Sequence, residues 1–220
     1  MLYDFDFTAA FITGTDTGVG KTHVTLELAK RILQQHKKLW VLKPVATGCI
    51  RQNNHLYSED YLRYKSLDNP NFSIYEGFTF KEPVSPNIAA SLAKIELSAQ
   101  KIAAWCQDKI SSSNANVLLE GAGGLLVPLN NTQTWVDVLQ LLQIPIILVV
   151  GIKLGCLNHA LLSSYVIEAN KLPFMGWIAN KIDPFCLYPE KIIETLEQKI
   201  SAKYLGYFNV KTSHSACCII

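Results

Sequence analysis

The stretch GTDTGVGKT, which runs from Gly14 to Thr22, decides how this chain folds. An apolar run over residues 8–13 precedes it and predicts a strand, and a helical pattern over residues 20–35 follows it. Small residues between a strand and a helix allow backbone N–H groups to turn toward phosphate oxygens, and the helix N-terminus adds partial positive charge. The stretch therefore predicts a phosphate-binding loop, or P-loop.

Two residues at the end of this loop have expected chemical roles. Lys21 would reach the β- and γ-phosphates of a nucleotide, and Thr22 would offer its hydroxyl to Mg²⁺. The loop is one residue longer than the common pattern, because its first glycine is Gly14 and position 15 is Thr15. The alternative is a glycine-rich turn with an incidental lysine, which leaves the joint occurrence of strand, glycines, lysine and threonine unexplained.

Apolar strands and helical patterns alternate along the rest of the chain. Strands are predicted over residues 8–13, 39–44, 116–120, 145–150 and 174–179, and helices over residues 20–35, 98–110, 134–142, 156–170 and 189–200. Near-continuous apolar strands separated by helices are typical of a mostly parallel central sheet with helices on both faces. The prediction is an α/β, P-loop NTPase-like fold in a single domain over residues 1–220, with its site at the carboxyl ends of the strands. Residues 49–86 are polar and predict loops with a short helix around residues 59–64.

Composition argues against several kinds of partner. The 220 residues include 20 Lys and Arg against 18 Asp and Glu, a formal net charge of +2, which gives no electrostatic case for nucleic acid or an anionic membrane. No apolar run is long enough to cross a membrane. The six cysteines form no CxxC pair, and the N-terminus lacks the basic start of a signal peptide. We therefore expect a cytoplasmic protein.

Charged residues close two of the predicted strands. Lys43 ends the second strand, with Thr47 as a possible hydroxyl donor after it, and Glu120 ends the third strand before the glycine-rich residues 121–124. Because the carboxyl ends of parallel strands share one edge of the sheet, Lys43 is expected to meet a phosphate or substrate, and Glu120 to bind Mg²⁺. The alternatives are a lysine that extends into water and a glutamate in a solvated turn.

Three further places are ambiguous on pattern alone. Asp60 lies in the polar segment, where a surface position is the simplest interpretation. Residues 153–159 begin a helix after the fourth strand, so their N–H groups indicate either an anion site or an ordinary turn. Asn180 closes the fifth strand, where its amide could pair with a purine edge or simply form a turn.

Taken together and in order, these pieces resemble the dethiobiotin synthetase family. The matching stretches are GTDTGVGKT (14–22), KPVATG (43–48), EPVSPNIAAS (82–91), EGAGG (120–124), VGIKLGCLNHA (150–160) and GWIAN (176–180). The phosphate loop is shared with many NTPases, but its additional residue is similar to the loop of this family. The stretches KPVATG and KLGCLNHA are far more specific.

The resemblance implies a homodimeric ligase of biotin biosynthesis that depends on ATP and Mg²⁺. Its substrate would be 7,8-diaminopelargonic acid, also called 7,8-diaminononanoate, and CO2 or bicarbonate would supply the ureido carbon. In this family one amine becomes a carbamate, ATP phosphorylates it to a carbamic-phosphoric anhydride, and the second amine closes the ring to give dethiobiotin.

The resemblance also implies roles for individual residues. The implied catalytic residues are Lys21 and Lys43, beside the carbamate and the γ-phosphate, and Thr17, near the reacting amine. The implied Mg²⁺ ligands are Thr22, Asp60 and Glu120. The implied ATP-binding positions are Gly18, Val19, Gly20, Lys21, Thr22, Asp60, Glu120, Gly121, Ala122, Gly123 and, at the adenine, Asn180. The implied substrate-binding positions are Thr47 and, toward the substrate carboxylate in the neighbouring subunit, Gly155, Cys156, Leu157 and Asn158.

Two places differ from the family pattern. Gly18 stands where the family often has an acidic residue, and residues 205–210 replace the Ile-Pro type of loop that completes the adenine pocket, which predicts looser recognition of the base. The alternative function is an ATP-switched binding module of the ParA and MinD type. Such proteins have a signature lysine early in the loop, where this chain has Thr15 and Asp16, and often end in a basic amphipathic helix, which residues 203–220 do not predict.

Overall fold

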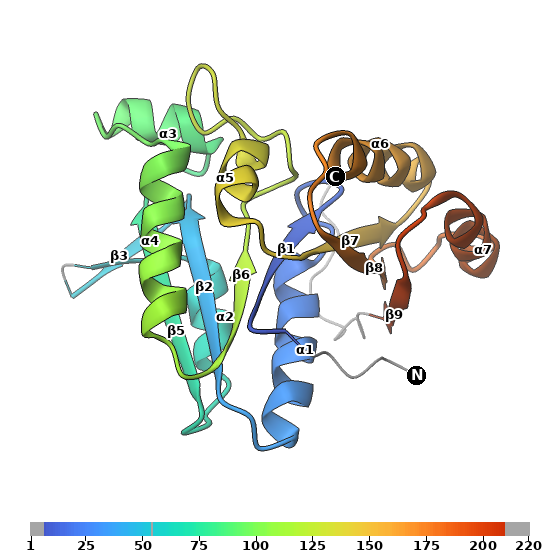
Figure 1. Ribbon diagram of the computed structural model, residues 1–220, viewed down its shortest axis with the longest axis horizontal. Helices are drawn as coiled ribbons and strands as arrows, with labels where there is room; N and C mark the ends of the chain where they lie inside the picture. Colours follow the sequence, from blue (N-terminus) through green and yellow to red (C-terminus); the bar gives the residue numbers. More distant parts are fainter. Residues whose placement is uncertain (1–6, 54, 210–220) are drawn as a thin grey trace, which may run out of the picture.

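One parallel sheet organises the part of the chain that the computed structural model describes, residues 7–53 and 55–209 (Figure 1). Its seven strands lie in the order β5-β2-β6-β1-β7-β8-β9, and each neighbouring pair is parallel. The strands are β1 (Ala9–Gly14), β2 (Leu39–Ala46), β5 (Phe72–Thr79), β6 (Asn116–Glu120), β7 (Ile146–Ile152), β8 (Phe174–Lys181) and β9 (Tyr204–Asn209). The phosphate loop therefore follows the central strand of the sheet.

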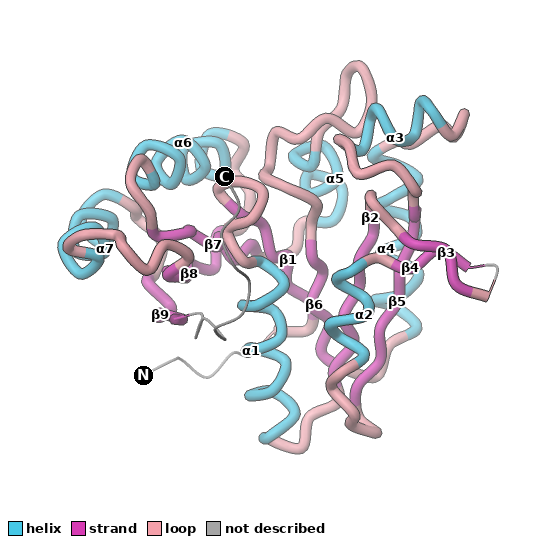
Figure 2. The backbone as a smooth tube through the Cα atoms, turned by 180° about the vertical axis from the view of Figure 1, so that it is seen from behind, coloured by secondary structure: helices cyan, strands magenta, loops and turns pink. Residues whose placement is uncertain are grey.

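Helices cover both faces of this sheet, and each face has its own apolar core. The helices α1 (Lys21–Gln34) and α2 (Glu59–Lys65) pack on one face, which is in front in Figure 2. The opposite face is covered by α3 (Pro86–Leu92), α4 (Ala99–Ser112), α5 (Trp135–Leu142), α6 (Cys156–Ala169) and α7 (Pro189–Lys199). Alternate side chains of β1 enter the two cores, Ile12 on the α1 side and Phe11 on the other. The predicted fold class is confirmed.

The sequence does not predict the two edge strands. β5 and β9 lie at opposite edges of the sheet, and a separate hairpin of β3 (Ile50–Gln52) and β4 (His55–Tyr57) stands beside it. Every residue of β5 is only partly buried, and Ser73, Glu76 and Gly77 interrupt its apolar pattern. An edge strand buries less side-chain surface than a central one, so a weaker apolar pattern is enough to form it. The short helix predicted around residues 59–64 is present as α2.

The loops at the carboxyl ends of the strands place the predicted site residues along one edge.

No helix among the described residues is long and apolar enough to cross a membrane. Val210, the last residue of the segment that differs from the family's adenine loop, and the rest of residues 210–220 lie outside the described residues.

Candidate phosphate and metal site

The phosphate loop connects β1 to α1 at the centre of this edge. Gly18 and Gly20 have φ angles of 75° and 85°, in the left-handed region that glycine adopts at little cost. A Cβ on Gly20 would lie 2.1 Å from Asn180 Nδ2, so this position also needs glycine for space. The Thr15 N–H donates to the Val149 carbonyl oxygen at 3.0 Å, which ties the loop to β7. The loop thus has a defined shape that depends on its glycines.

Two buried lysines lie beside this loop. Lys21 begins α1, is 7% exposed, and donates from Nζ to the Asp16 carbonyl oxygen at 3.3 Å. Burial, together with the nearby Lys43 ammonium, lowers the pKa of Lys21 to about 8. Lys43, on β2, donates to Glu120 Oε1 at 2.8 Å and pairs with Asp60 Oδ2 at 2.6 Å. Burial opposes the charge of Lys43, but these two carboxylates outweigh it and raise the pKa of Lys43 above its ordinary value.

Three hard oxygen atoms meet beside the lysines, from α1, α2 and β6. Thr22 Oγ1 lies 2.7 Å from Asp60 Oδ1 and 3.0 Å from Glu120 Oε1. A hydroxyl has one hydrogen to donate, so Thr22 can satisfy only one of these carboxylate oxygens at a time. A cation placed among the three would remove that mismatch, and Mg²⁺ prefers such oxygen ligands. These side chains therefore fit the predicted Mg²⁺.

The carboxyl groups of the site have pKa values that shift in opposite directions. Burial opposes ionisation of Asp60, but the Lys43 ammonium and the Thr22 hydroxyl outweigh it and lower the pKa of Asp60. Burial raises the pKa of Glu120, which is 1% exposed, despite the attraction of Lys43.

Within residues 7–53 and 55–209 no group of three His, Cys, Asp or Glu side chains could hold a metal. Mg²⁺ here would complete its ligands with water and nucleotide oxygens, which is its usual habit at phosphate sites.

These groups line a cavity of about 500 Å³ at the mouth of the loop. Most of the predicted catalytic, nucleotide and metal positions line it, namely Thr17, Gly18, Gly20, Lys21, Thr22, Lys43, Thr47, Asp60, Glu120, Ala122 and Gly123. Val19 and Gly121 are buried beside these residues. The pattern-based interpretation of Asp60 as a surface residue is wrong, because α2 folds back and turns this carboxylate toward Thr22 and Lys43.

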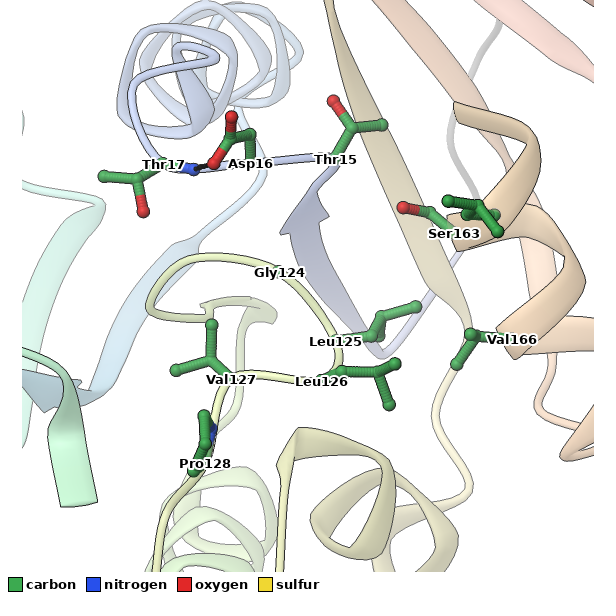
Figure 3. A pocket seen from close by; sticks show the side chains of 11 residues that line it. Thr15, Asp16, Thr17, Gly124, Leu125, Leu126, Val127, Pro128, Ser163 and Val166 are labelled. Atoms are coloured by element: carbon green, nitrogen blue, oxygen red, sulfur yellow. Dashed lines mark hydrogen bonds between the residues drawn. The ribbon is translucent and has the colours of Figure 1, made fainter. Parts of the chain in front are cut away.

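A second cavity, of about 350 Å³, lies next to the first (Figure 3). Its walls are the phosphate loop at residues 15–17, the segment at residues 124–128, and α6 at Leu162, Ser163 and Val166. Leu125 and Leu126 face α6 across it in Figure 3, and with Val127 they make much of its wall apolar. The two cavities share Thr17.

Asn180 is fully buried where β8 ends. Its Nδ2 donates to the Val19 carbonyl oxygen at 2.8 Å, while its Oδ1 has no hydrogen-bond partner among the described residues. The amide therefore supports the phosphate loop and retains a free acceptor. In the neighbouring β9, Phe208 is 6% exposed and packs edge-on against His23, with ring centroids 6.2 Å apart.

The predicted carboxylate-binding segment, residues 155–158, does not line the cavity that contains the two lysines. Gly155 caps the start of α6 with a left-handed φ of 88°, and Gly155 and Asn158 are exposed. None of the residues 155–158 lines either cavity. Lys153, just before them, lies with its Nζ 3.7 Å from Asp16 Oδ2. This segment does not join the phosphate cavity of its own chain.

One residue that touches the site is missed by sequence reasoning. The Tyr64 hydroxyl donates to Glu120 Oε2. The available signal is its spacing from Asp60, since residues four apart on a helix lie on the same face.

Known proteins resemble this chain along most of its length. The protein family described as an AAA domain matches residues 8–214. An ATP-dependent dethiobiotin synthetase BioD from Legionella pneumophila (strain Philadelphia 1) is 39% identical over 209 residues, which cover 95% of this chain and 97% of that protein. Another, from Nitrosospira multiformis, is 37% identical over 207 residues, 94% of this chain and 90% of that protein. A solved ParA family ATPase from Chlorobium tepidum superposes with a TM-score of 0.57 at 14% identity, over 91% of this chain and 84% of that one, which shows a shared fold.

Proposed function

The chain belongs to the family of ATP-dependent dethiobiotin synthetases, and we propose that it closes the ureido ring of dethiobiotin from 7,8-diaminopelargonic acid (7,8-diaminononanoate), CO2 or bicarbonate, and ATP. The observation that supports this most is the meeting of Lys21 and Lys43 with Thr22, Asp60 and Glu120 in one cavity. Phosphoryl transfer needs positioned cations more than covalent catalysis, and this cavity supplies two.

The proposed reaction has three steps. One amine of the substrate attacks CO2 and loses a proton, which gives a carbamate. An oxygen of the carbamate attacks the γ-phosphorus of ATP, ADP leaves, and a carbamic-phosphoric anhydride forms. The second amine attacks the carbonyl carbon of this anhydride and expels phosphate, which closes the ring as a cyclo-ligase.

In this proposal each of the two lysines attracts a different negatively charged group of the substrates. Lys21, at the start of α1, attracts the β- and γ-phosphates, and Lys43 attracts the carbamate. Lys43 is paired with Asp60 and Glu120 in the structure, so the incoming carbamate meets an ammonium that is already fixed in place. Thr17 lies near the reacting amine and Thr47 offers a further hydroxyl to the substrate; both line the cavity.

Mg²⁺ is proposed to bind Thr22, Asp60 and Glu120. When bound, it neutralises charge on the transferring phosphoryl group. Binding of the cation would also favour the ionised form of Glu120, whose pKa burial raises. Asn180 is proposed to offer its free Oδ1 to the amino group of adenine.

A homodimer with composite sites is the proposed assembly. Leu154, just before α6, and Leu162 and Tyr165, along α6, expose 94%, 56% and 69% of their surface, an apolar area that a second copy could cover. Residues 155–158 of the second copy would then hold the substrate carboxylate with helix N-terminal N–H groups. The apolar wall of the second cavity suits the methylene chain between the carboxylate and the amines. We propose that the protein acts in the cytoplasm, where ATP is present, without a nucleic acid or membrane partner.

A direct assay tests this function. Purified protein is incubated with the diamine, bicarbonate, Mg²⁺ and each of the four common NTPs, and dethiobiotin is detected by mass. Dethiobiotin should appear with ATP, and phosphate release should require both the diamine and the carbon source. Phosphate release that needs neither would support an ATP-switched binding module instead, for which the ParA family likeness provides the shared fold alone.

A further inference from the structure

Tyr64 contacts the candidate metal site but has no role in the reaction described above. Its side chain is fully buried in the core on the α1 side of the sheet. A phenol hydroxyl is costly to bury without a hydrogen-bond partner. Its partner is Glu120 Oε2, to which the Tyr64 hydroxyl donates.

The contacts of Glu120 divide between its two oxygens. Oε1 accepts from Lys43 Nζ at 2.8 Å and lies 3.0 Å from Thr22 Oγ1. Oε2 accepts from Tyr64. The terminal torsion of a glutamate side chain is broad, so the carboxylate can rotate unless donors fix it. Lys43, on Oε1, and Tyr64, on the far oxygen, are donors in a position to fix this rotation.

One short helix sets the position of both carboxylates. Asp60 and Tyr64 are four residues apart on α2, so their side chains project from the same face. Asp60 binds Thr22 and Lys43 directly, while Tyr64 reaches Glu120. The Ser58 side chain caps this helix by accepting from the Tyr61 N–H at 3.0 Å, which fixes where the helix begins.

We propose that Tyr64 is a positioning residue of the Mg²⁺-nucleotide site. Its hydroxyl holds Glu120 so that Oε1 faces the cation together with Thr22 and Asp60, and it acts only through Glu120. This inference rests on the proposed function in one respect, namely that the cavity binds a nucleotide with Mg²⁺.

The test compares nucleotide binding with and without the metal. Tyr64→Phe keeps the ring and its packing but removes the hydroxyl. Calorimetry should show about a tenfold loss of affinity for Mg²⁺-ADP, since partners of metal ligands contribute about 10–100-fold to metal affinity. Affinity for ADP in EDTA should stay at the wild-type value, as should the KM for the diamine. The matched control is Tyr61→Phe on the same helix. The ring centroid of Tyr61 lies 4.8 Å from that of Tyr57. This variant should match wild type in both nucleotide affinities and in the KM for the diamine.

Three outcomes would overturn the inference. The first is an unchanged affinity of Tyr64→Phe for Mg²⁺-ADP. The second is an equal loss of affinity with and without the metal, which would indicate general damage to the site. The third uses Glu120→Ala as background, which removes both acceptor oxygens: Tyr64→Phe should add nothing there, and a further tenfold loss would mean that the Tyr64 hydroxyl acts independently of Glu120. The affinity measurements need neither diamine nor CO2, so they fail or succeed separately from the ligase assay.

Discussion

The phosphate cavity and the start of α6 lie at the same edge of the sheet, yet they are built in opposite ways. Lys43 and Glu120 in the cavity are almost fully buried and paired, whereas Gly155 and Asn158 at the start of α6 are exposed. A buried charge without a partner is costly, and Lys43 has both of its carboxylate partners, Asp60 and Glu120, within its own chain. An exposed helix start has no such cost. The contrast fits a reaction in which phosphoryl transfer belongs to one chain and the substrate carboxylate to a second.

The largest expected effect tests the role of the phosphate cavity. Lys21→Ala should lower turnover by about 10²–10³-fold or more, because it removes a cation aligned with the developing phosphate charge. The matched control is Lys30→Ala on the same helix, where the lysine pairs with Glu27 at the surface. Steady-state formation of dethiobiotin measures both variants. Near-normal turnover of a folded Lys21→Ala protein would refute the role of Lys21.

A smaller effect sharpens the account of how the loop is built. Gly20→Ala and Gly18→Ala both place a side chain at positive φ, which costs about 1–2 kcal/mol of unfolding free energy. Only at Gly20 would the new Cβ also meet Asn180, at 2.1 Å from Nδ2, and disturb its bond to Val19. Urea unfolding should therefore show Gly20→Ala to be less stable than Gly18→Ala by about 1 kcal/mol, the value of one hydrogen bond. Equal stabilities would mean that Asn180 moves aside without cost.

A further expected effect concerns the base rather than the phosphates. Asn180→Ala removes the free Oδ1 acceptor, so the preference for ATP over the other NTPs should fall by an amount equivalent to about 1–3 kcal/mol. Asn170→Ala is a suitable control, because this amide donates to the Val166 carbonyl oxygen and accepts from Gln140 at the end of α6, and it lines neither cavity. The ratio of kcat/KM values for ATP and GTP measures the change. A strong preference for ATP that survives Asn180→Ala would show that other residues recognise the base.

The sequence predicts the central features of the molecule because they rest on local patterns. The strand, loop and helix around Gly14 and Thr22 form a contiguous motif, and strands such as β7, buried throughout, have continuous apolar runs. Asp60 has no such local signal, since its place beside Thr22 depends on how residues 49–65 fold back; only the resemblance to a family pointed to it. Tyr64 had no signal apart from its spacing to Asp60. The edge strands β5 and β9 were not predicted, because their partial burial leaves only a weak apolar pattern in the sequence.

Mixing two inactive variants tests the central claim most directly. Lys43→Ala damages the site of its own chain, and Leu157→Asp with Asn158→Asp should repel the substrate carboxylate in the partner's site. A heterodimer would then have one site with both lesions and one intact site, so a fully exchanged equal mixture should recover about a quarter of wild-type dethiobiotin formation on symmetry grounds. Subunit exchange is verified by native mass spectrometry. Activity that stays at the level of the separate variants after confirmed exchange would contradict the claim, and residues 155–158 would then serve their own chain or only begin a helix.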